Sequence, residues 1–199
     1  MNVKIIKEGK EKKYKLIKSW SDVTLEKWLK LITHKTKLKS KEAEETIAAL
    51  SNIPKKLINQ LGIQDISVIL KRIGELQAKQ NTNLKRIIEV EGNEYGFHPK
   101  LDDITLGEYA DIETLIKNGI EDSLPQLMAI LYRPIVEKKN KIYIIEAYDG
   151  NIDIRAETFK KMKAEQVQSA LVFFWIGVNE LFKILPSSLR ERTQEILKQ

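Results

Sequence analysis

The chain has 199 residues, of which 42% are hydrophobic and 31% are charged. This balance excludes a disordered protein and supplies enough apolar side chain for one core or two small ones. The absence of cysteine excludes disulfide frameworks, thiolate metal centres and cysteine nucleophiles. Leu and Ile outnumber the aromatic residues, which favours an α+β fold that is mainly α.

The net charge of +6 is concentrated at one end of the chain. Residues 1–41 contain thirteen Lys and four acidic residues, a balance of +9, so the remaining residues carry −3. Lys10, Lys12, Lys13 and Lys15 form the centre of this basic arm and are the candidate anion-binding residues. All of the arm's cations are Lys, without an Arg that could grip base edges, so a solvated surface is preferred over nucleic-acid binding.

The sequence contains no segment of the length that crosses a membrane. Its start has no continuous apolar region of the kind that signal peptides carry, so we expect a cytoplasmic protein. The longest apolar run, residues 170–178, has nine residues, whereas a spanning helix needs about 20. This run is therefore expected to be a core helix and not a membrane anchor.

Residues 1–80 are predicted to form a first half of one β-hairpin and several helices. Short alternating runs around Gly9 predict the hairpin. Asp22 or Thr24 is positioned to cap the first helix. Residues 33–41 lack apolar periodicity and are expected to be an exposed linker, after which Ser40 is the expected cap of the next helix. Two more helices are expected to begin near Pro54 and Asp65.

Residues 84–199 are predicted to form a second half, beyond a polar boundary at residues 77–83. A second hairpin is expected with its turn at Gly92-Asn93, followed by a helix from Thr105, and a third hairpin is expected near residues 135–147. Residues 164–185 are apolar nearly all round and are expected to be the central helix of this half. A polar helix is expected after Pro186.

A short internal repeat relates the two halves. Residues 22–28 and 103–109 share the order acid, β-branched residue, Thr, Leu, two further residues and an aromatic, at an offset of 81 residues. Thr105 and Glu108 have the spacing of a capping box, whereas Thr24 and Lys27 do not. The repeat predicts two related hairpin-plus-helices halves that pack together.

No motif in the chain carries recognisable catalytic chemistry. The two histidines, His34 and His98, belong to no triad pattern, and the nine glycines form no phosphate-binding loop. Adjacent acids such as Asp102-Asp103 point apart on a helix, which makes caps the better interpretation than a metal or glycosidase pair. Residues 148–153 are expected to form a turn and not a calcium loop. The sequence therefore predicts no enzyme, no cofactor and no metal.

Four residues are candidate partner-binding residues. Trp20 and Trp28 flank the first helix start, and their alternative interpretation as core anchors is the preferred one. Tyr132 and Arg133 stand at a predicted helix end, where an aromatic and an Arg could meet a partner, although a surface loop is the default.

The order of these blocks resembles small tail-morphogenesis proteins of tailed bacteriophages, in particular the tail assembly chaperones and their relatives. The resemblance rests on SWSDVTLEKWLKLI, LDDITLGEYADIETLI, LMAILYRPI, YDG and RAETFKKMKAEQVQSALVFFWIGVNEL, and it covers nearly the whole chain. It implies a non-enzymatic protein of the host cytoplasm that binds a tape measure protein or tail subunits. The family pattern provides no catalytic residues, and the basic N-terminus has no counterpart in it.

Two other functions remain open at this point. The chain could be a structural subunit of the virion, in the neck, the tail or associated with the capsid, in which case it would be present in purified particles. A nucleic-acid-binding protein that uses the basic arm is less favoured, and its binding would depend steeply on salt.

Overall fold

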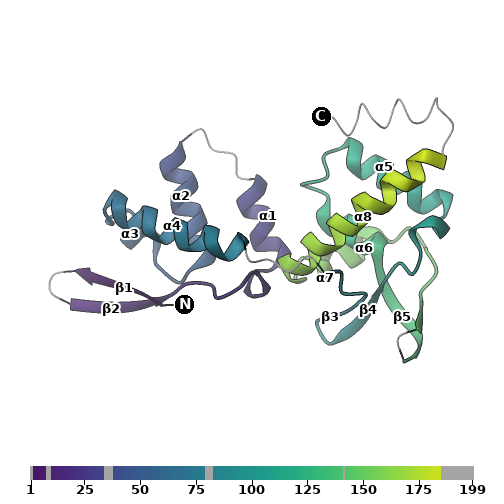
Figure 1. The fold of residues 1–199 in the computed structure, drawn as a ribbon, viewed down its shortest axis with the longest axis horizontal. Helices are drawn as coiled ribbons and strands as arrows, with labels where there is room; N and C mark the ends of the chain where they lie inside the picture. The colour runs from purple at the N-terminus through teal and green to yellow at the C-terminus, as the bar shows by residue number, and fades with distance from the viewer. Residues whose placement is uncertain (1, 8–9, 34–37, 79–82, 141, 185–199) are drawn as a thin grey trace. The chain divides into compact units, whose positions relative to one another are not determined.

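The computed structural model describes residues 2–7, 10–33, 38–78, 83–140 and 142–184, without the side chains of residues 7, 10, 77, 78 and 178–184. The chain divides into two compact units (Figure 1). Unit 1 comprises Met1–Asn81 with Lys163–Glu165, and unit 2 comprises Thr82–Met162 with Gln166–Gln199. The described residues form eight α-helices and six strands in two small sheets, which confirms an α+β fold that is mainly α.

Unit 1 begins with the hairpin that the alternating runs predict. Its strands, β1 (Asn2–Lys7) and β2 (Lys10–Lys15), pair antiparallel with Val3 opposite Tyr14 and Ile5 opposite Lys12. Opposite residues of such a pair lie on one face, and successive residues alternate between faces. Val3 and Ile5 are buried in the core of unit 1, so this face of the hairpin packs inward.

The helices of unit 1 provide the rest of its core. They are η1 (Trp20–Asp22), α1 (Leu25–Thr33), α2 (Lys39–Leu50), α3 (Lys55–Ile58) and α4 (Ile63–Ala78). On α4, Ile69 and Ile73 are buried four residues apart, the spacing of one helix face, and Ile47 and Leu50 of α2 join the same core cluster. The linker prediction was wrong for Thr33, the last residue of α1, and for residues 39–41, which begin α2. Residues 34–37 lie outside the described part of the chain.

The caps of unit 1 follow the prediction only in part. Ser19 and Asp22 form a capping box at η1, and Thr24 Oγ1 accepts a bond from the amide of Lys27 at 3.4 Å. Ser40 does not cap α2, because the N-cap position is Leu38, which makes no side-chain cap bond. The helix therefore starts two residues earlier than its polar residues suggest.

Three residues that the sequence assigns to the second half belong to unit 1. The amide of Ala164 donates to the carbonyl of Val23 at 2.8 Å, and Lys163 forms an isolated antiparallel bridge with Thr24. The Ala164 side chain is buried within the unit 1 core cluster. A boundary drawn at one place in the sequence cannot describe this arrangement, because the two contacts join residues 141 and 139 positions apart.

Unit 2 is built on a four-stranded antiparallel sheet. The strands β3 (Ile87–Val90), β4 (Asn93–Phe97), β5 (Tyr132–Lys139) and β6 (Ile142–Ile145) lie in the order β3-β4-β5-β6. Both predicted hairpins are present. The β3-β4 turn is at Glu91-Gly92, with φ of 50° and 80°, one residue earlier than predicted. Positive φ at both central residues is the type I′ geometry that matches strand twist.

The helices of unit 2 are η2 (Leu101–Asp103), α5 (Leu106–Lys117), α6 (Leu124–Leu131), α7 (Ile152–Phe159) and α8 (Ala164–Ile184). In α6 all residues except Gln126 are buried, so α6 is the most enclosed helix among the described residues of unit 2. In α8, the expected central helix, Val167, Ala170 and Phe174 are buried, whereas Val172 and Ile176 are exposed, so its apolar residues do not all face a core. The predicted helix after Pro186 lies outside the described residues.

The internal repeat appears as matching elements. Each copy consists of a short 3-10 helix, a two-residue connection and an α-helix, and η2 and α5 each begin 81 residues after η1 and α1. The predicted capping box of Thr105 and Glu108 is confirmed, with both reciprocal bonds present. The hairpins that precede the copies differ, since β1-β2 forms a two-stranded sheet while β3-β4 is half of a four-stranded one.

Candidate protein-binding groove

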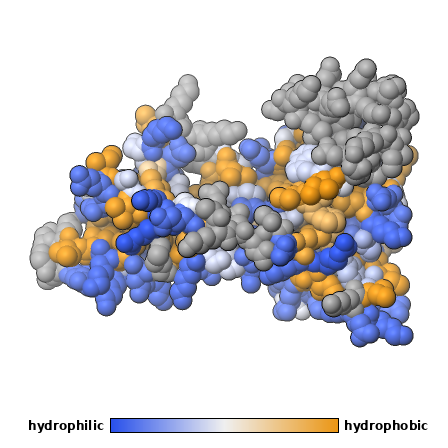
Figure 2. All heavy atoms as spheres, viewed as in Figure 1, coloured by the Kyte–Doolittle hydropathy of each residue, from blue (hydrophilic) through white to orange (hydrophobic). Residues whose placement is uncertain are grey.

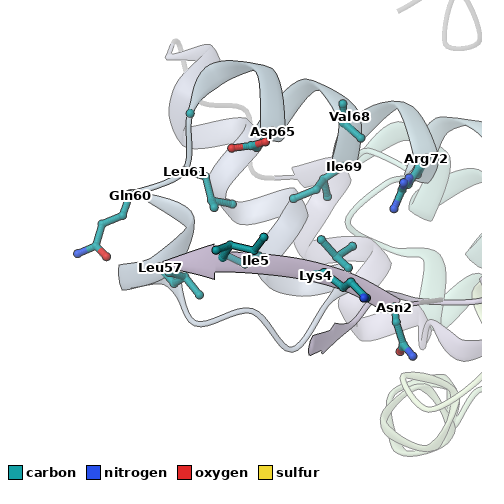
Figure 3. A pocket seen from close by; sticks show the side chains of 13 residues that line it. Asn2, Lys4, Ile5, Leu57, Gln60, Leu61, Asp65, Val68, Ile69 and Arg72 are labelled. Carbon is teal, nitrogen blue, oxygen red and sulfur yellow. The ribbon is translucent and has the colours of Figure 1, made fainter. Parts of the chain in front are cut away.

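A groove of about 580 Å³ lies in unit 1 between β1 on one side and α3 and α4 on the other (Figure 3). It is lined by thirteen residues: Asn2, Val3, Lys4, Ile5, Ile6, Leu57, Gln60, Leu61, Gly62, Asp65, Val68, Ile69 and Arg72. The segments that form it are far apart in sequence, so the groove is a product of the tertiary fold.

The helical wall of the groove is one stripe. Leu61, Asp65, Val68 and Arg72 follow one another at intervals of four, three and four residues, which places them on one side of a helix and the turn before it. Leu61 and Arg72 are directed toward β1 in Figure 3. Ile69 is buried and forms the apolar floor of the groove. Arg72 places a positive charge toward the C-terminal end of this helical wall.

The opposite wall is the edge of β1. Five consecutive residues, 2–6, line the groove. Because successive strand residues point to opposite faces, a cavity that meets all five must run along the strand and touch its backbone. Among the described strands, β1 has β2 as its one neighbour. In an antiparallel pair, the backbone N–H and C=O groups of every second residue point away from the partner strand. In β1 these outward groups point away from β2, toward the groove.

Described residues cover part of the outer edge of β2, whereas none of them pairs with the outer edge of β1. The amide of Lys15 donates to Asn52 Oδ1 at 2.6 Å, and the amide of Asn52 donates to the Lys15 carbonyl at 3.0 Å. The amide of Ile17 donates to the carbonyl of Leu50 at 3.0 Å. The chain around residues 50–52 therefore covers the C-terminal end of the β2 edge.

Large apolar side chains stand exposed around the groove. Ile6 and Val68 line it and are 72% and 51% exposed, and Ile63, at the start of α4, is 85% exposed. In the view of Figure 2, hydrophobic surface on unit 1 lies between hydrophilic surface. Exposed apolar surface of this kind next to a groove is typical of protein interaction sites.

The charged residues that line the groove are Lys4, Asp65 and Arg72, and all three are exposed. Lys4 Nζ lies 3.0 Å from Glu11 Oε1 of β2. The lining residues thus carry a net charge of +1, and β1, which forms one wall, belongs to the basic N-terminal segment. An acidic occupant would therefore be favoured electrostatically over a basic one.

Of the four candidate anion-binding lysines, the three with described side chains do not form one cluster. Lys12 lies opposite Ile5, on the inward face of the hairpin, while Lys13 and Lys15 lie opposite Lys4 and Asn2 on the other face. Lys12, Lys13 and Lys15 are exposed, and the side chain of Lys10 lies outside the described residues. The structure thus distributes these charges over two faces and does not converge them on one anion.

The two tryptophans belong to the core of unit 1. Trp20 is buried in the core cluster, and Trp28 is half-buried against it. The core-anchor interpretation, preferred from the sequence, describes these positions. Trp20 does not fit the interpretation as a partner-binding residue, because its ring is not accessible in this conformation.

Tyr132 and Arg133 are also buried, which corrects their interpretation as surface residues. The hydroxyl of Tyr132 donates to the carbonyl of Lys85 at 2.8 Å, and burial raises its pKa. Arg133 Nη2 lies 2.7 Å from Glu108 Oε1. The helix that was expected to end in a loop passes directly into β5, so both side chains lie inside unit 2.

Glu108 is the centre of a buried ionic cluster. Its Oε2 accepts bonds from the amide and the hydroxyl of Thr105, both at 2.7 Å, while its Oε1 faces Arg133 and lies 3.6 Å from His98 Nε2. Burial lowers the pKa of His98, an effect that Glu108 opposes and Arg133 supports. Burial likewise lowers the pKa of Arg133, against the effect of Glu108. The arrangement ties the first turn of α5 to β5.

A second polar contact extends this cluster toward the turn at residues 148–153. The Tyr148 hydroxyl donates to Asp111, and the Tyr148 ring lies 5.8 Å from the Arg133 guanidinium carbon. Asp149 accepts from Arg155 at 2.6 Å and from the amide of Asn151 at 3.0 Å, and these bonds lower its pKa to about 2. Gly150 has a positive φ of 76°, so the segment is the Asp-Gly turn that the sequence predicts.

Within the described residues, no group of three or more His, Asp or Glu side chains is placed to hold a metal ion. None of the helices in the described part of the chain is long and apolar enough to span a membrane. Comparison with family models, with curated proteins and with solved structures finds no match to this chain.

Sequence reasoning missed the groove. The apolar positions of α4 predict a helix, but the same pattern describes both a buried face and the wall of an open groove. Glu108 was found as a cap, while its second contact with Arg133 had no signal in the sequence. Position relative to the other elements decides both roles, and no local pattern contains that information.

Proposed function

We propose that this protein acts by stoichiometric binding of another protein, as a non-enzymatic assembly factor of bacteriophage tail morphogenesis in the host cytoplasm. The observation that supports this most directly is the groove of unit 1, with its apolar floor and its exposed Ile6 and Val68. The resemblance to tail assembly chaperones supplies the partner class, which is a tape measure protein or a tail subunit.

The energetics of the groove favour a bound partner. Complete burial of an exposed aliphatic side chain contributes about 1.5–3 kcal/mol, so covering Ile6 and Val68, which line the groove, supplies several kcal/mol toward binding. Part of this is offset by the ordering of the partner segment. The expected affinity is that of a transient complex, which suits a factor that must release its partner when the tail assembles.

A virion structural subunit is the second candidate. Unit 2 has its own exposed apolar residues on the β5-β6 hairpin, where Val136, Ile142 and Ile144 are exposed. Ile142 and Ile144 alternate along β6 and therefore share one face. A subunit that contacts several neighbours needs more than one such surface, whereas an assembly factor with one partner does not.

Mass spectrometry of purified virions separates the two candidates. An assembly factor is absent from particles and is recovered with tail proteins from infected cells, whereas a subunit appears in particles in a fixed ratio. Finding the chain in particles at a constant ratio would overturn the assembly-factor proposal.

Co-expression tests the groove. The protein is expected to keep the tape measure protein soluble, and Val68→Glu is expected to remove this effect because it puts a charge on the apolar wall. The matched control is Leu38→Glu, since Leu38 is 55% exposed in the same unit and does not line the groove.

The basic arm is tested in the same assay. Changing Lys10, Lys12, Lys13 and Lys15 to Gln is expected to leave the solubilising effect largely intact, because the three described side chains, those of Lys12, Lys13 and Lys15, do not line the groove. If this variant loses partner binding while the wild-type protein shifts DNA at low salt, the nucleic-acid alternative replaces the proposal.

A further inference from the structure

We propose that the groove binds its partner by strand addition: an extended, acidic segment of the partner protein pairs with the edge of β1 that faces away from β2 and lays its apolar side chains against α4. This inference rests on the proposed function and specifies the form and charge of the bound segment.

The first argument is hydrogen bonding. Residues 2–6 of β1 line the groove, and among the described strands β1 pairs only with β2, on its other edge. The edge that borders the groove therefore presents a row of backbone donors and acceptors. A helix in the groove would cover these groups without bonding them, because its own backbone groups are already paired. An extended segment satisfies them, which is the mode of binding that sheet edges offer.

The second argument is the chemistry of the opposite wall. Alternate side chains of an added strand would face α4, where Val68 and Ile69 provide apolar contacts. Lys4 and Arg72 line the groove against one acid, Asp65, and Lys4 also pairs with Glu11. Arg72 is therefore the cation that most favours Asp or Glu at the remaining positions. The expected segment therefore alternates apolar and acidic residues.

The third argument excludes a second copy of β1 as the occupant. The sequence of β1, NVKIIK, contains two Lys and no acid. Self-pairing would bring like charges together across the added ladder, which is unfavourable, and lysines on edge strands oppose such association. A heterologous acidic strand meets no such repulsion.

The experiment uses the full-length protein and a synthetic peptide of alternating Val and Glu. About nine residues are sufficient, since a strand advances about 3.3 Å per residue and must span β1. The peptide is expected to bind and to slow amide hydrogen exchange at alternate residues within 2–6, by about tenfold or more when bound. Amide exchange in β2 is the internal reference, because residues 50–52 already cover part of the edge of that strand.

Backbone N-methylation identifies the binding mode. Two versions of the peptide are made, each methylated at one of the two alternating sets of amides. Strand addition predicts that one version loses about tenfold or more in affinity, since several backbone bonds are removed, while the other retains it within a small factor. Equal affinity of both methylated versions would contradict backbone pairing, and loss of both would indicate a helical occupant.

Charge reversal tests the acidic preference. Arg72→Glu is expected to weaken binding of the Val-Glu peptide and to strengthen binding of a Val-Lys peptide. The control is Lys71→Glu, which changes an exposed neighbour on α4 that does not line the groove. Equal effects of the two variants would show that net charge acts at a distance and would contradict the assigned contact.

The two proposals fail separately. If Val68→Glu abolishes co-expression solubility while the peptide leaves β1 exchange unchanged, the groove binds a partner in another form, and strand addition is overturned. If the peptide pairs with β1 but the tape measure protein and tail subunits remain insoluble with the wild-type chain, the tail-assembly function is overturned and the binding mode stands. If the protein forms concentration-dependent dimers that slow amide exchange in β1 without peptide, the occupant of the groove is a second copy of the chain, and the proposal of an acidic partner segment is overturned.

Discussion

At the scale of single residues, Glu108 joins local and long-range structure. One of its oxygens caps α5 through Thr105, and the other faces the guanidinium of Arg133 at 2.7 Å. Its side chain is 1% exposed, so this ion pair is screened little by solvent. Removing one partner of a buried pair leaves the other charge without compensation.

Replacing Glu108 by Gln is therefore expected to destabilise the protein by about 3–5 kcal/mol, measured by urea unfolding. Gln can still close a capping box, so the loss reports on the charge of the carboxylate. The control Glu113→Gln, on the same helix, is expected to change stability by about 0.5 kcal/mol or less. The double variant Glu108→Leu with Arg133→Met should recover much of the loss, and failure to recover would contradict this account.

His98 gives a pH dependence to the same cluster. Burial lowers its pKa in the folded protein, so as the pH falls the unfolded chain binds a proton on this residue first. The stability associated with neutral His98 is present above the ordinary histidine pKa of about 6.5 and decreases as the pH falls below it. Unfolding free energies should decrease more between pH of about 7.5 and 5.5 for wild type than for His98→Gln. Parallel pH profiles would contradict the depressed pKa.

At the scale of elements, Gly96 marks a place where side chains of β6 closely approach β4. A Cβ at Gly96 of β4 would meet the Tyr143 ring, with Cδ2 at 2.6 Å, and Ile145 Cγ2 at 2.8 Å. The Tyr143 hydroxyl also donates to the carbonyl of Phe97 at 2.7 Å, which holds the ring over β4. The absence of a side chain at Gly96 is therefore what lets β6 pack across β4.

Gly96→Ala is expected to destabilise unit 2 by about 1–3 kcal/mol, because the ring must move from its position. Gly74→Ala is the matched substitution on α4, where nothing lies within 4 Å of the added carbon. It is expected to stabilise unit 1 by about 0.5–1 kcal/mol, since Ala is the better helix former. Thermal unfolding of both variants checks these opposite signs, and equal signs would refute the packing argument.

At the scale of the whole molecule, the two units are expected to respond separately to changes in their cores. Ala164 is fully buried in the unit 1 cluster, and Ala156 of α7 is buried in unit 2. Enlarging either to Leu overpacks one core, at a cost of about 1–3 kcal/mol.

Ala164→Leu is expected to speed amide exchange at Ile47 and Leu50 of unit 1, although these residues are more than a hundred positions away in sequence. Ala156→Leu is expected to speed exchange in α6 and leave those two amides unchanged. If Ala164→Leu instead affected α6 alone, the assignment of Lys163–Glu165 to unit 1 would be wrong.

Local patterns were sufficient for the fold class, the hairpins, most helices and the capping box of Thr105 and Glu108. Each depends on residues within a few positions of one another, where alternation, helical spacing and cap chemistry act directly. The start of α2 was misplaced because its cap is Leu38, which carries no polar signal.

Long-range contacts settled the remainder. The sequence suggested loop positions for Tyr132 and Arg133, but the pairing of β5 with β4 buries them. The apolar residues of α8 gave no sign that Val172 and Ile176 would be exposed while α6 is buried at all positions except Gln126. The groove requires β1 and α4 to lie side by side, and among the described residues the segment 50–52 covers β2 while no strand pairs with the other edge of β1. An apolar stripe has the same spacing whether it faces a core or a groove, and a strand has the same alternation whether or not its edge is paired. The tertiary contacts alone distinguish these cases, because they determine which backbone groups and side chains solvent can still reach.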